Sequence, residues 1–269
     1  MGLGVSRFWW PPGLIAELVG RGFQVVAYDQ RDAGQSTRFA GTEKVHPVVA
    51  LFRPRPPAYS AEDMTDDAAA VLDALGWESA HLLGHSTGGL LVQRTALRHP
   101  GRVRAITISG AVPSDAGPLR LLRYVNPGTV ARFSRLRFPE DREGDVALGL
   151  ALSRALAAPG HPWDEAAARA VIGRDVVSGV RDNRAQSRQI GAKWHGARLA
   201  EIRVPTVVPH GEQAPLIRPS AALHTASAIP GARLVLPARR RARPSQLMWS
   251  RVADEVRGVA DRARSAPRS

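Results

Sequence analysis

Short apolar runs alternate with helical periodicities along the first 112 residues of the chain. Three apolar runs, Phe23–Tyr28, Ala80–Leu83 and Val103–Ser109, predict buried strands. Apolar residues recur at helical spacing in three further segments: Trp9–Arg21, Ala61–Leu75 and Leu90–Leu97. Strands that alternate with helices in this way predict a parallel, doubly wound sheet.

The pattern changes over residues 113–200, where helical periodicities follow one another and no strand is expected. The predicted helices lie at Leu119–Tyr124, Val146–Ala157, Trp163–Ile172 and Arg181–Gln189. The alternation then returns with Val204–Val208 (strand), Leu216–Ala228 (helix), Ala232–Leu236 (strand) and Met248–Ala263 (helix). We therefore expect an α/β core formed by residues 1–112 and 201–269, with residues 113–200 inserted as a helical cap.

The segment Gly84-His85-Ser86-Thr87-Gly88-Gly89 lies between a predicted strand and a predicted helix. A G-x-S-x-G sequence in that position is typical of a nucleophile elbow, which holds a serine hydroxyl above the sheet. Glycine at positions 84 and 88 removes side chains that would clash in so sharp a turn. The N–H groups that open the following helix, Thr87 first, face developing negative charge. The alternative interpretation is a plain strand-to-helix turn with a capping serine.

Composition limits the remaining function classes. The 269 residues suffice for one large α/β domain with a sizeable core. The sequence contains no cysteine, which excludes disulfides, thiol nucleophiles and zinc–thiolate sites. The formal net charge is +13, and all but two of the 37 basic side chains are arginines. They are scattered and accompany no nucleic-acid motif, so no nucleic-acid partner is expected. No membrane span or signal peptide is visible, which predicts a cytoplasmic location without membrane contact.

Three ordered motifs resemble the α/β-hydrolase fold family. They are Tyr28–Thr37 (YDQRDAGQST), Gly84–Gly89 (GHSTGG) and His210–Leu216 (HGEQAPL). Within that family, the chain is most similar to actinobacterial hydrolases of the aclacinomycin methylesterase type. The resemblance implies a serine hydrolase that acts on a small molecule, with Ser86 as nucleophile and no metal or organic cofactor. It also implies a nucleophile, acid and histidine that follow one another in that order along the chain.

The first residues resemble a loop that follows an early strand in this family. By that resemblance, Leu3 and Thr87 supply the two N–H groups of an oxyanion hole. The family has strands before this point, so we expect a fold that lacks its first strands. Either the true start lies upstream or the chain is a truncated descendant. In both cases the predicted strand Phe23–Tyr28 is left partly unpaired.

The position of the catalytic acid departs from the family pattern. The family has H-G-E-x-D-P-L, whereas this chain has Ala214 where the aspartate belongs. Alanine cannot orient or stabilise an imidazolium ion. Asp115, just after the strand Val103–Ser109, is a candidate substitute because some family members place the acid there. Glu212 is a second candidate, and a solvated loop carboxylate is the alternative for both.

The position of the histidine base departs as well. The family has a Gly-His pair after the last strand, and the aligned base position here is Arg241. A guanidinium group keeps its proton in proteins and cannot act as a general base. A compensated frameshift over residues 238–243 would account for this arginine run. The candidate substitutes are cap histidines, His195 and His161, for which a surface or packing role is the alternative. His85 is expected to line the pocket or pack, and His210 lies at a strand end.

Two hypotheses follow from these residues. The first is a serine hydrolase of esterase type, acting on a small apolar ester or a related carbonyl compound. The second is a catalytically impaired pseudo-hydrolase that keeps Ser86 and the pocket and serves as a binder or gene remnant. A lyase or cyclase on the same fold is a third possibility, since fold does not fix function.

Overall fold

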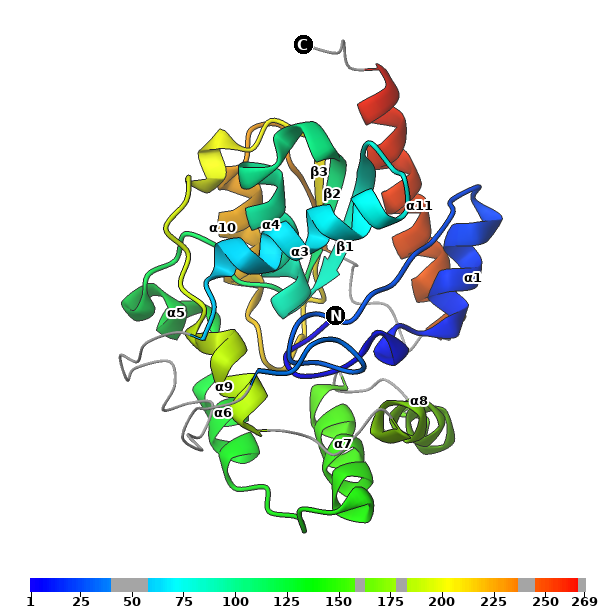
Figure 1. Ribbon diagram of the computed structural model, residues 1–269, viewed down its shortest axis with the longest axis vertical. Helices are drawn as coiled ribbons and strands as arrows, with labels where there is room; N and C mark the ends of the chain where they lie inside the picture. Colours follow the sequence, from blue (N-terminus) through cyan, green and yellow to red (C-terminus); the bar gives the residue numbers. More distant parts are fainter. Residues whose placement is uncertain (40–57, 158–162, 178–182, 237–244, 266–269) are drawn as a thin grey trace.

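A four-stranded parallel sheet forms the centre of the computed structural model, which describes residues 1–39, 58–157, 163–177, 183–236 and 245–265 (Figure 1). The strands are β1 (Ala80–His85), β2 (Val103–Ser109), β3 (Thr206–Pro209) and β4 (Arg233–Val235). They pair in that order, with Leu82 opposite Ile106, Thr107 opposite Val207, and Val208 opposite Leu234. The sheet of the described residues has fewer strands than the α/β-hydrolase fold that the sequence resembles, as predicted.

Alternating side chains along the strands face two helical layers. On one face, Ile106, Ile108 and Val208 join a buried cluster with side chains of α4 (Thr87–Arg98) and α10 (Pro219–Ala228). On the other face, Ala105 and Val207 pack on Val259 of α11 (Ser245–Ser265). A strand directs successive side chains to opposite faces, so a strand covered on both sides is apolar throughout. This explains why VRAITIS reads as a nearly continuous apolar run.

Two further helices complete these layers. The helix α3 (Ala61–Ala74) begins at a capping box, in which Ser60 Oγ accepts the Asp63 N–H and the Asp63 carboxylate accepts the Ser60 N–H. It packs on α4, while α1 (Pro12–Gly20) packs on α11 on the opposite face of the sheet. The 3₁₀ turns η1, η2 and η3 cover Arg7–Trp9, Pro100–Arg102 and Leu199–Glu201.

The described residues between β2 and β3 form five helices. They are α5 (Pro118–Tyr124), α6 (Pro127–Ser134), α7 (Arg142–Leu156), α8 (Glu165–Val177) and α9 (Asn183–Gly191). In Figure 1, α6, α7, α8 and α9 lie beyond the end of the sheet to which the strands point. The described part of 113–200 contains helices and no strand, apart from an isolated bridge between Val125 and Ile217.

Two expectations about secondary structure were wrong. Residues 23–28 are extended but form no strand, because no described residue pairs with their backbone. The helix α6 was not expected, because only a few apolar residues stand among its proline, glycine and polar residues. The other predicted helices and strands are confirmed to within a few residues at their ends.

A buried ion pair joins α9 to the loop that follows residues 23–28. The Arg188 guanidinium donates two hydrogen bonds of 2.7 Å to the Asp32 carboxylate, and the two side chains are 2% and 0% exposed. Burial alone would raise the pKa of Asp32, but hydrogen bonds from the Arg188 guanidinium and the Phe39 N–H outweigh burial and lower it. The pair therefore fastens the helical segment to the core in its charged form.

The described residues contain no membrane-spanning helix and no cluster of metal ligands. None of the described helices is long and apolar enough to cross a bilayer. No group of three or more histidine and carboxylate side chains in the described ranges is arranged to hold a metal ion.

Substitution of Arg188 tests the buried ion pair. Arg188→Met leaves Asp32 buried without its cation, and we expect a loss of about 3–5 kcal/mol in the free energy of unfolding. The matched control is Arg98→Met, which breaks the half-exposed pair with Asp66 and should cost at most about 1 kcal/mol. Urea unfolding at pH 7 measures both. Because the folded-state pKa of Asp32 is lowered, the contribution of the ion pair to the free energy of unfolding should decrease as the pH drops through that pKa. Equal losses in the two variants would contradict this interpretation.

Candidate active site

Ser86 occupies a strained turn between the end of β1 and the start of α4. Its backbone angles are φ 56° and ψ −120°, and Asp32 is the one other non-glycine residue with positive φ in the described ranges. L-residues other than glycine adopt such angles only where the surrounding structure enforces them. The Ser86 N–H donates a 2.9 Å hydrogen bond to the Ser109 carbonyl at the end of β2, which anchors the turn to the sheet.

Glycines make this turn sterically possible. A Cβ atom added at Gly84 would lie 2.1 Å from the Gly88 carbonyl oxygen. One added at Gly88 would lie 2.8 Å from the Met1 nitrogen, and one at Gly89 would lie 2.6 Å from the Ala111 Cβ. These separations are shorter than any ordinary contact of a Cβ atom. The sequence Gly84-x-Ser86-x-Gly88 therefore has the backbone geometry of a nucleophile elbow.

The loop Met1–Gly4 lies directly beside the turn. The Gly88 N–H donates to the Met1 carbonyl at 2.8 Å, and a Cβ atom added at Gly2 would lie 3.9 Å from Ser86 Oγ. The Leu3 N–H donates to no described residue, whereas the Gly4 N–H is held by Gln189 Oε1 at 2.9 Å. Thr87 is the first residue of α4, and N–H groups at that position have no acceptor within the helix. The loop Met1–Gly4 and the first residue of α4 therefore both lie beside Ser86.

Long-range contacts from α8 and α9 hold this loop in place. The Asp175 carboxylate accepts the Ser6 N–H at 3.1 Å and the Trp9 indole N–H at 2.7 Å. Gln189 holds the Gly4 N–H and also donates to the Arg31 carbonyl at 2.8 Å. Sequence reasoning missed both residues, because nothing in a local pattern shows a partner more than 150 positions away.

Gln93 positions the other side of the turn. This fully buried side chain of α4 donates to the Gly89 and Val112 carbonyls and accepts the Ser114 N–H. The contacts fix the loop after β2 against the start of α4. A signal was present in the sequence, since Gln93 is a polar residue among the apolar positions of that helix.

The candidate acids lie apart from the turn. Asp115 is exposed, and its Oδ2 accepts the Leu199 N–H at 3.4 Å. Glu212 is exposed in the turn after β3, and Ala214 lies in the same turn with its N–H on the Gly211 carbonyl. Among the described residues, the Asp115 carboxylate forms no hydrogen bond or ion pair with a histidine.

None of the six histidines in the described part of the chain forms a hydrogen bond with Ser86. The His85 Nδ1 lies 3.2 Å from Ser109 Oγ. The His195 Nδ1 lies 3.7 Å from the Oε1 atom of the Glu62 carboxylate. His210 is buried, which lowers its pKa, and its Nε2 donates to the Ile217 carbonyl at 2.9 Å. His161 and the predicted base position, Arg241, lie outside the described residues.

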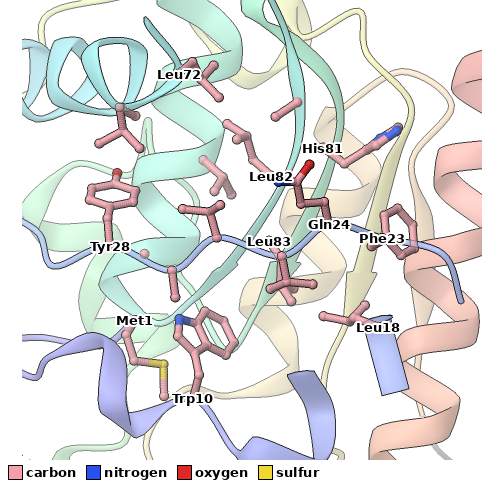
Figure 2. Close-up of a pocket in the computed structure, with 18 of the residues that line it drawn as sticks. Met1, Trp10, Leu18, Phe23, Gln24, Tyr28, Leu72, His81, Leu82 and Leu83 are labelled. Atoms are coloured by element: carbon pink, nitrogen blue, oxygen red, sulfur yellow. The ribbon is translucent and has the colours of Figure 1, made fainter. Parts of the chain in front are cut away.

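An apolar pocket lies on the β1 side of the turn. Gly88 and Met1 form its end nearest the turn, while Ser86 is not among the residues that line it. Figure 2 shows side chains of β1 (Leu82, Leu83) and of the segment 23–28 (Tyr28, Phe23) around this pocket. The pocket therefore lies beside the turn, and the Ser86 side chain does not face into it.

Comparison with known proteins identifies the family of this architecture. The alpha/beta hydrolase fold family matches residues 2–239. Rhodomycin D methylesterase DauP from Streptomyces sp. (strain C5) is 27% identical over 253 residues, which cover 84% of this chain and 77% of that relative. A protein named as a carbamate hydrolase, RutD from Caulobacter vibrioides (strain NA1000 / CB15N), is 35% identical over 107 residues. That match covers 40% of this chain, which spans about a third (34%) of the length of that relative.

Solved structures show the same fold. The esterase RhEst1 from Rhodococcus sp. ECU1013 superposes with a TM-score of 0.69 at 23% identity, over 97% of this chain and 88% of the esterase. The meta-cleavage product hydrolase CumD from Pseudomonas fluorescens IP01 gives a TM-score of 0.65 at 21% identity, with the same coverage of both chains.

Substitution of a glycine tests the geometry of the turn. In Gly84→Ala the new methyl group meets the Gly88 carbonyl, and we expect a loss of about 1–3 kcal/mol in the free energy of unfolding. The matched control is Gly101→Ala, because no atom lies within 4 Å of a Cβ added there. Thermal and urea unfolding measure both variants. If Gly84→Ala is as stable as Gly101→Ala, the two backbones are not packed as closely as described.

Proposed function

Because this chain belongs to the alpha/beta hydrolase fold family, we propose that it is a serine hydrolase in which Ser86 attacks the carbonyl carbon of an ester or a related compound. The observation that carries the proposal is the positive φ of Ser86, held by glycine contacts that no other residue could make. Strain at one defined residue is maintained only by the packing around it, and it is concentrated at functional positions. The methylesterase and esterase among the relatives support ester chemistry.

The proposed reaction has two steps. Ser86 Oγ bonds to the carbonyl carbon as its proton leaves, and the carbonyl oxygen takes the negative charge. The Leu3 and Thr87 N–H groups donate to that oxygen, and the positive end of the α4 dipole adds to their effect. Collapse of the intermediate expels the alcohol and leaves an acyl group on Ser86, which water then removes as a carboxylic acid. This chemistry requires no metal and no organic cofactor.

The proton acceptor sets the expected rate. Ala214 stands at the acid position, Arg241 stands at the base position, and no described histidine bonds to Ser86. A hydrolase without its histidine retains only the contribution of the oxyanion hole and substrate binding, on the order of 10³–10⁴-fold over water. We therefore infer a nucleophile that reacts but turns over several orders of magnitude more slowly than a complete relay. Asp115 or Glu212, with His195 or His161, are the candidate substitutes for the missing acid and base.

The second candidate is a pseudo-hydrolase that binds a ligand without catalysis, and Ala214 is the observation that favours it. Both candidates share the proposed division of the chain, in which residues 113–200 form a lid over Ser86 on the core of 1–112 and 201–269. Both also share the proposed ligand, a small and largely apolar carbonyl compound. They differ only in whether Ser86 reacts.

Labelling with a fluorophosphonate probe decides between the two candidates. We expect the folded protein to be labelled slowly and Ser86→Ala to lose the label, because the proposed Leu3 and Thr87 N–H donors stabilise the phosphoryl oxygen as Ser86 Oγ bonds to phosphorus. Ser227→Ala is the matched control, since Ser227 lies exposed on α10, and it should be labelled like the unaltered chain. Peptide mass mapping locates the label. A folded sample without label would establish the pseudo-hydrolase, and equal label on Ser86→Ala would remove Ser86 from the mechanism.

The pH dependence of this labelling identifies the proton acceptor. With no histidine on Ser86, the rate should rise about tenfold per pH unit without levelling off, as hydroxide alone removes the proton. A histidine base would instead give a plateau above its pKa, which is ordinarily about 6.5. A plateau that is lost in His195→Gln or His85→Gln would place that histidine in the relay.

A further inference from the structure

The buried side chain of Gln189 in α9 holds the loop that carries the Leu3 N–H. Its Oε1 atom accepts the Gly4 N–H at 2.9 Å, and its Nε2 atom donates to the Arg31 carbonyl at 2.8 Å. Gln189 is 4% exposed, so water competes little for these two hydrogen bonds. Figure 1 shows the N-terminal loop beside the end of β1, with α8 and α9 beyond it. One amide group of α9 therefore fixes two loops of the core.

The orientation of the Leu3 N–H depends on the contact at Gly4. Gly4 has a φ of 64°, in the left-handed region that favours glycine. Its N–H shares a peptide plane with the Leu3 carbonyl, so an acceptor for the Gly4 N–H sets the backbone direction of Leu3. A Cβ atom added at Gly4 would lie 2.4 Å from the Gln186 Cγ atom, so α9 also packs against the loop.

Leu3 lies between two fixed points of the loop. On one side, the Met1 carbonyl accepts the Gly88 N–H at 2.8 Å, which ties the loop to the start of α4. On the other side, Gln189 holds the Gly4 N–H. The first point belongs to the turn that presents Ser86, and the second belongs to the helical segment.

The core supplies no side chain that replaces Gln189 in this role. Among the described residues, the side chains that hydrogen-bond to the backbone of residues 1–6 are Gln189 and Asp175, and both lie within 113–200. The core carboxylate of Asp29 meets the N-terminal segment one residue later, where it accepts the Arg7 N–H at 2.6 Å. Loss of the contact at Gly4 would therefore leave the Leu3 donor without a fixed direction.

We propose that Gln189 is a positioning residue for the proposed hydrolysis, in which its hydrogen bond to the Gly4 N–H directs the Leu3 N–H at the oxygen of the carbonyl that Ser86 attacks. The inference rests on the proposed function and adds a control to it. A displacement of α9 withdraws one oxyanion donor and leaves the Ser86 turn unchanged. Gln189 itself touches no reacting atom, so its acceptor oxygen sets the rate only through Leu3.

Two substitutions at position 189 isolate the acceptor oxygen. Gln189→Met keeps an unbranched side chain of similar length but has no oxygen for the Gly4 N–H, whereas Gln189→Glu keeps one. We expect Gln189→Met to lower the maximal rate of fluorophosphonate labelling at Ser86 by about 10–100-fold, because a misdirected donor stabilises the phosphoryl oxygen poorly. The probe concentration for half-maximal rate should not change. Gln189→Glu should restore a rate close to that of the unaltered chain.

The matched control removes a different hydrogen bond between the helical segment and the core. The Thr129 hydroxyl of α6 donates to the Pro215 carbonyl at 2.7 Å, and Thr129 is 2% exposed. Thr129→Val breaks this contact far along the chain from the N-terminal loop, so urea unfolding should show a loss of stability and the labelling rate should not change. An equal drop in rate in Thr129→Val and Gln189→Met would overturn the inference, since general loosening would then explain both.

Hydrogen exchange of the Gly4 amide gives a second measurement that needs no reaction at Ser86. We expect exchange about tenfold faster in Gln189→Met than in Gln189→Glu, because the Gly4 N–H of the first variant has lost its acceptor. If near-UV circular dichroism shows that Gln189→Met does not fold, Gln189→Asn replaces it. That side chain is one methylene group shorter, so its amide is withdrawn from Gly4 and the same changes are expected.

The outcomes separate this inference from the proposed function. Equal labelling rates in Gln189→Met and the unaltered chain would overturn the inference alone and leave Ser86 as the nucleophile. Equal Gly4 exchange in the Met and Glu variants would also overturn it, because the amide would then not hold the loop. A folded, unaltered chain that takes no label would overturn the proposed hydrolysis and, with it, the inference.

Discussion

The close approach of two backbones, at Gly84 in β1 and Gly88 in α4, is the contact on which the candidate site depends. A methyl group at Gly84 would lie 2.1 Å from the Gly88 carbonyl oxygen, so any larger residue would push the start of α4 away from the strand. Because the two backbones lie this close, the chain must turn within the residues between Gly84 and Gly88. Ser86 takes a positive φ as a result. The raised hydroxyl, the first N–H of α4 and the contact with the loop Met1–Gly4 all follow from that turn.

Contacts from distant parts of the chain keep this geometry fixed. Asp175 and Gln189 hold the loop that carries Leu3, while the buried pair of Arg188 and Asp32 fastens α9 to the core. The same residues therefore join the helical segment to the candidate oxyanion hole. A lid built in this way would transmit its own movement to the Leu3 N–H.

The sequence predicted the features that local chemistry determines. Strand β2 and helix α3 follow from a mostly apolar run and from apolar residues at helical spacing, and the turn at Ser86 follows from glycines at two fixed positions. Residues 23–28 show the limit of this reasoning. Their apolar pattern is that of a strand, but a strand forms only with a partner backbone, which no described residue supplies. The contacts of Asp175, Arg188 and Gln189 were also beyond prediction, because they depend on how distant segments pack.

The central claim is that a serine held in this turn faces two backbone donors, and a crystal structure of the fluorophosphonate-treated protein tests it most directly. The account predicts a covalent bond from phosphorus to Ser86 Oγ. It also predicts that the phosphoryl oxygen lies about 2.7–3.1 Å from both the Leu3 and the Thr87 nitrogen atoms. An adduct on another residue, or a phosphoryl oxygen turned away from these two N–H groups, would contradict the account.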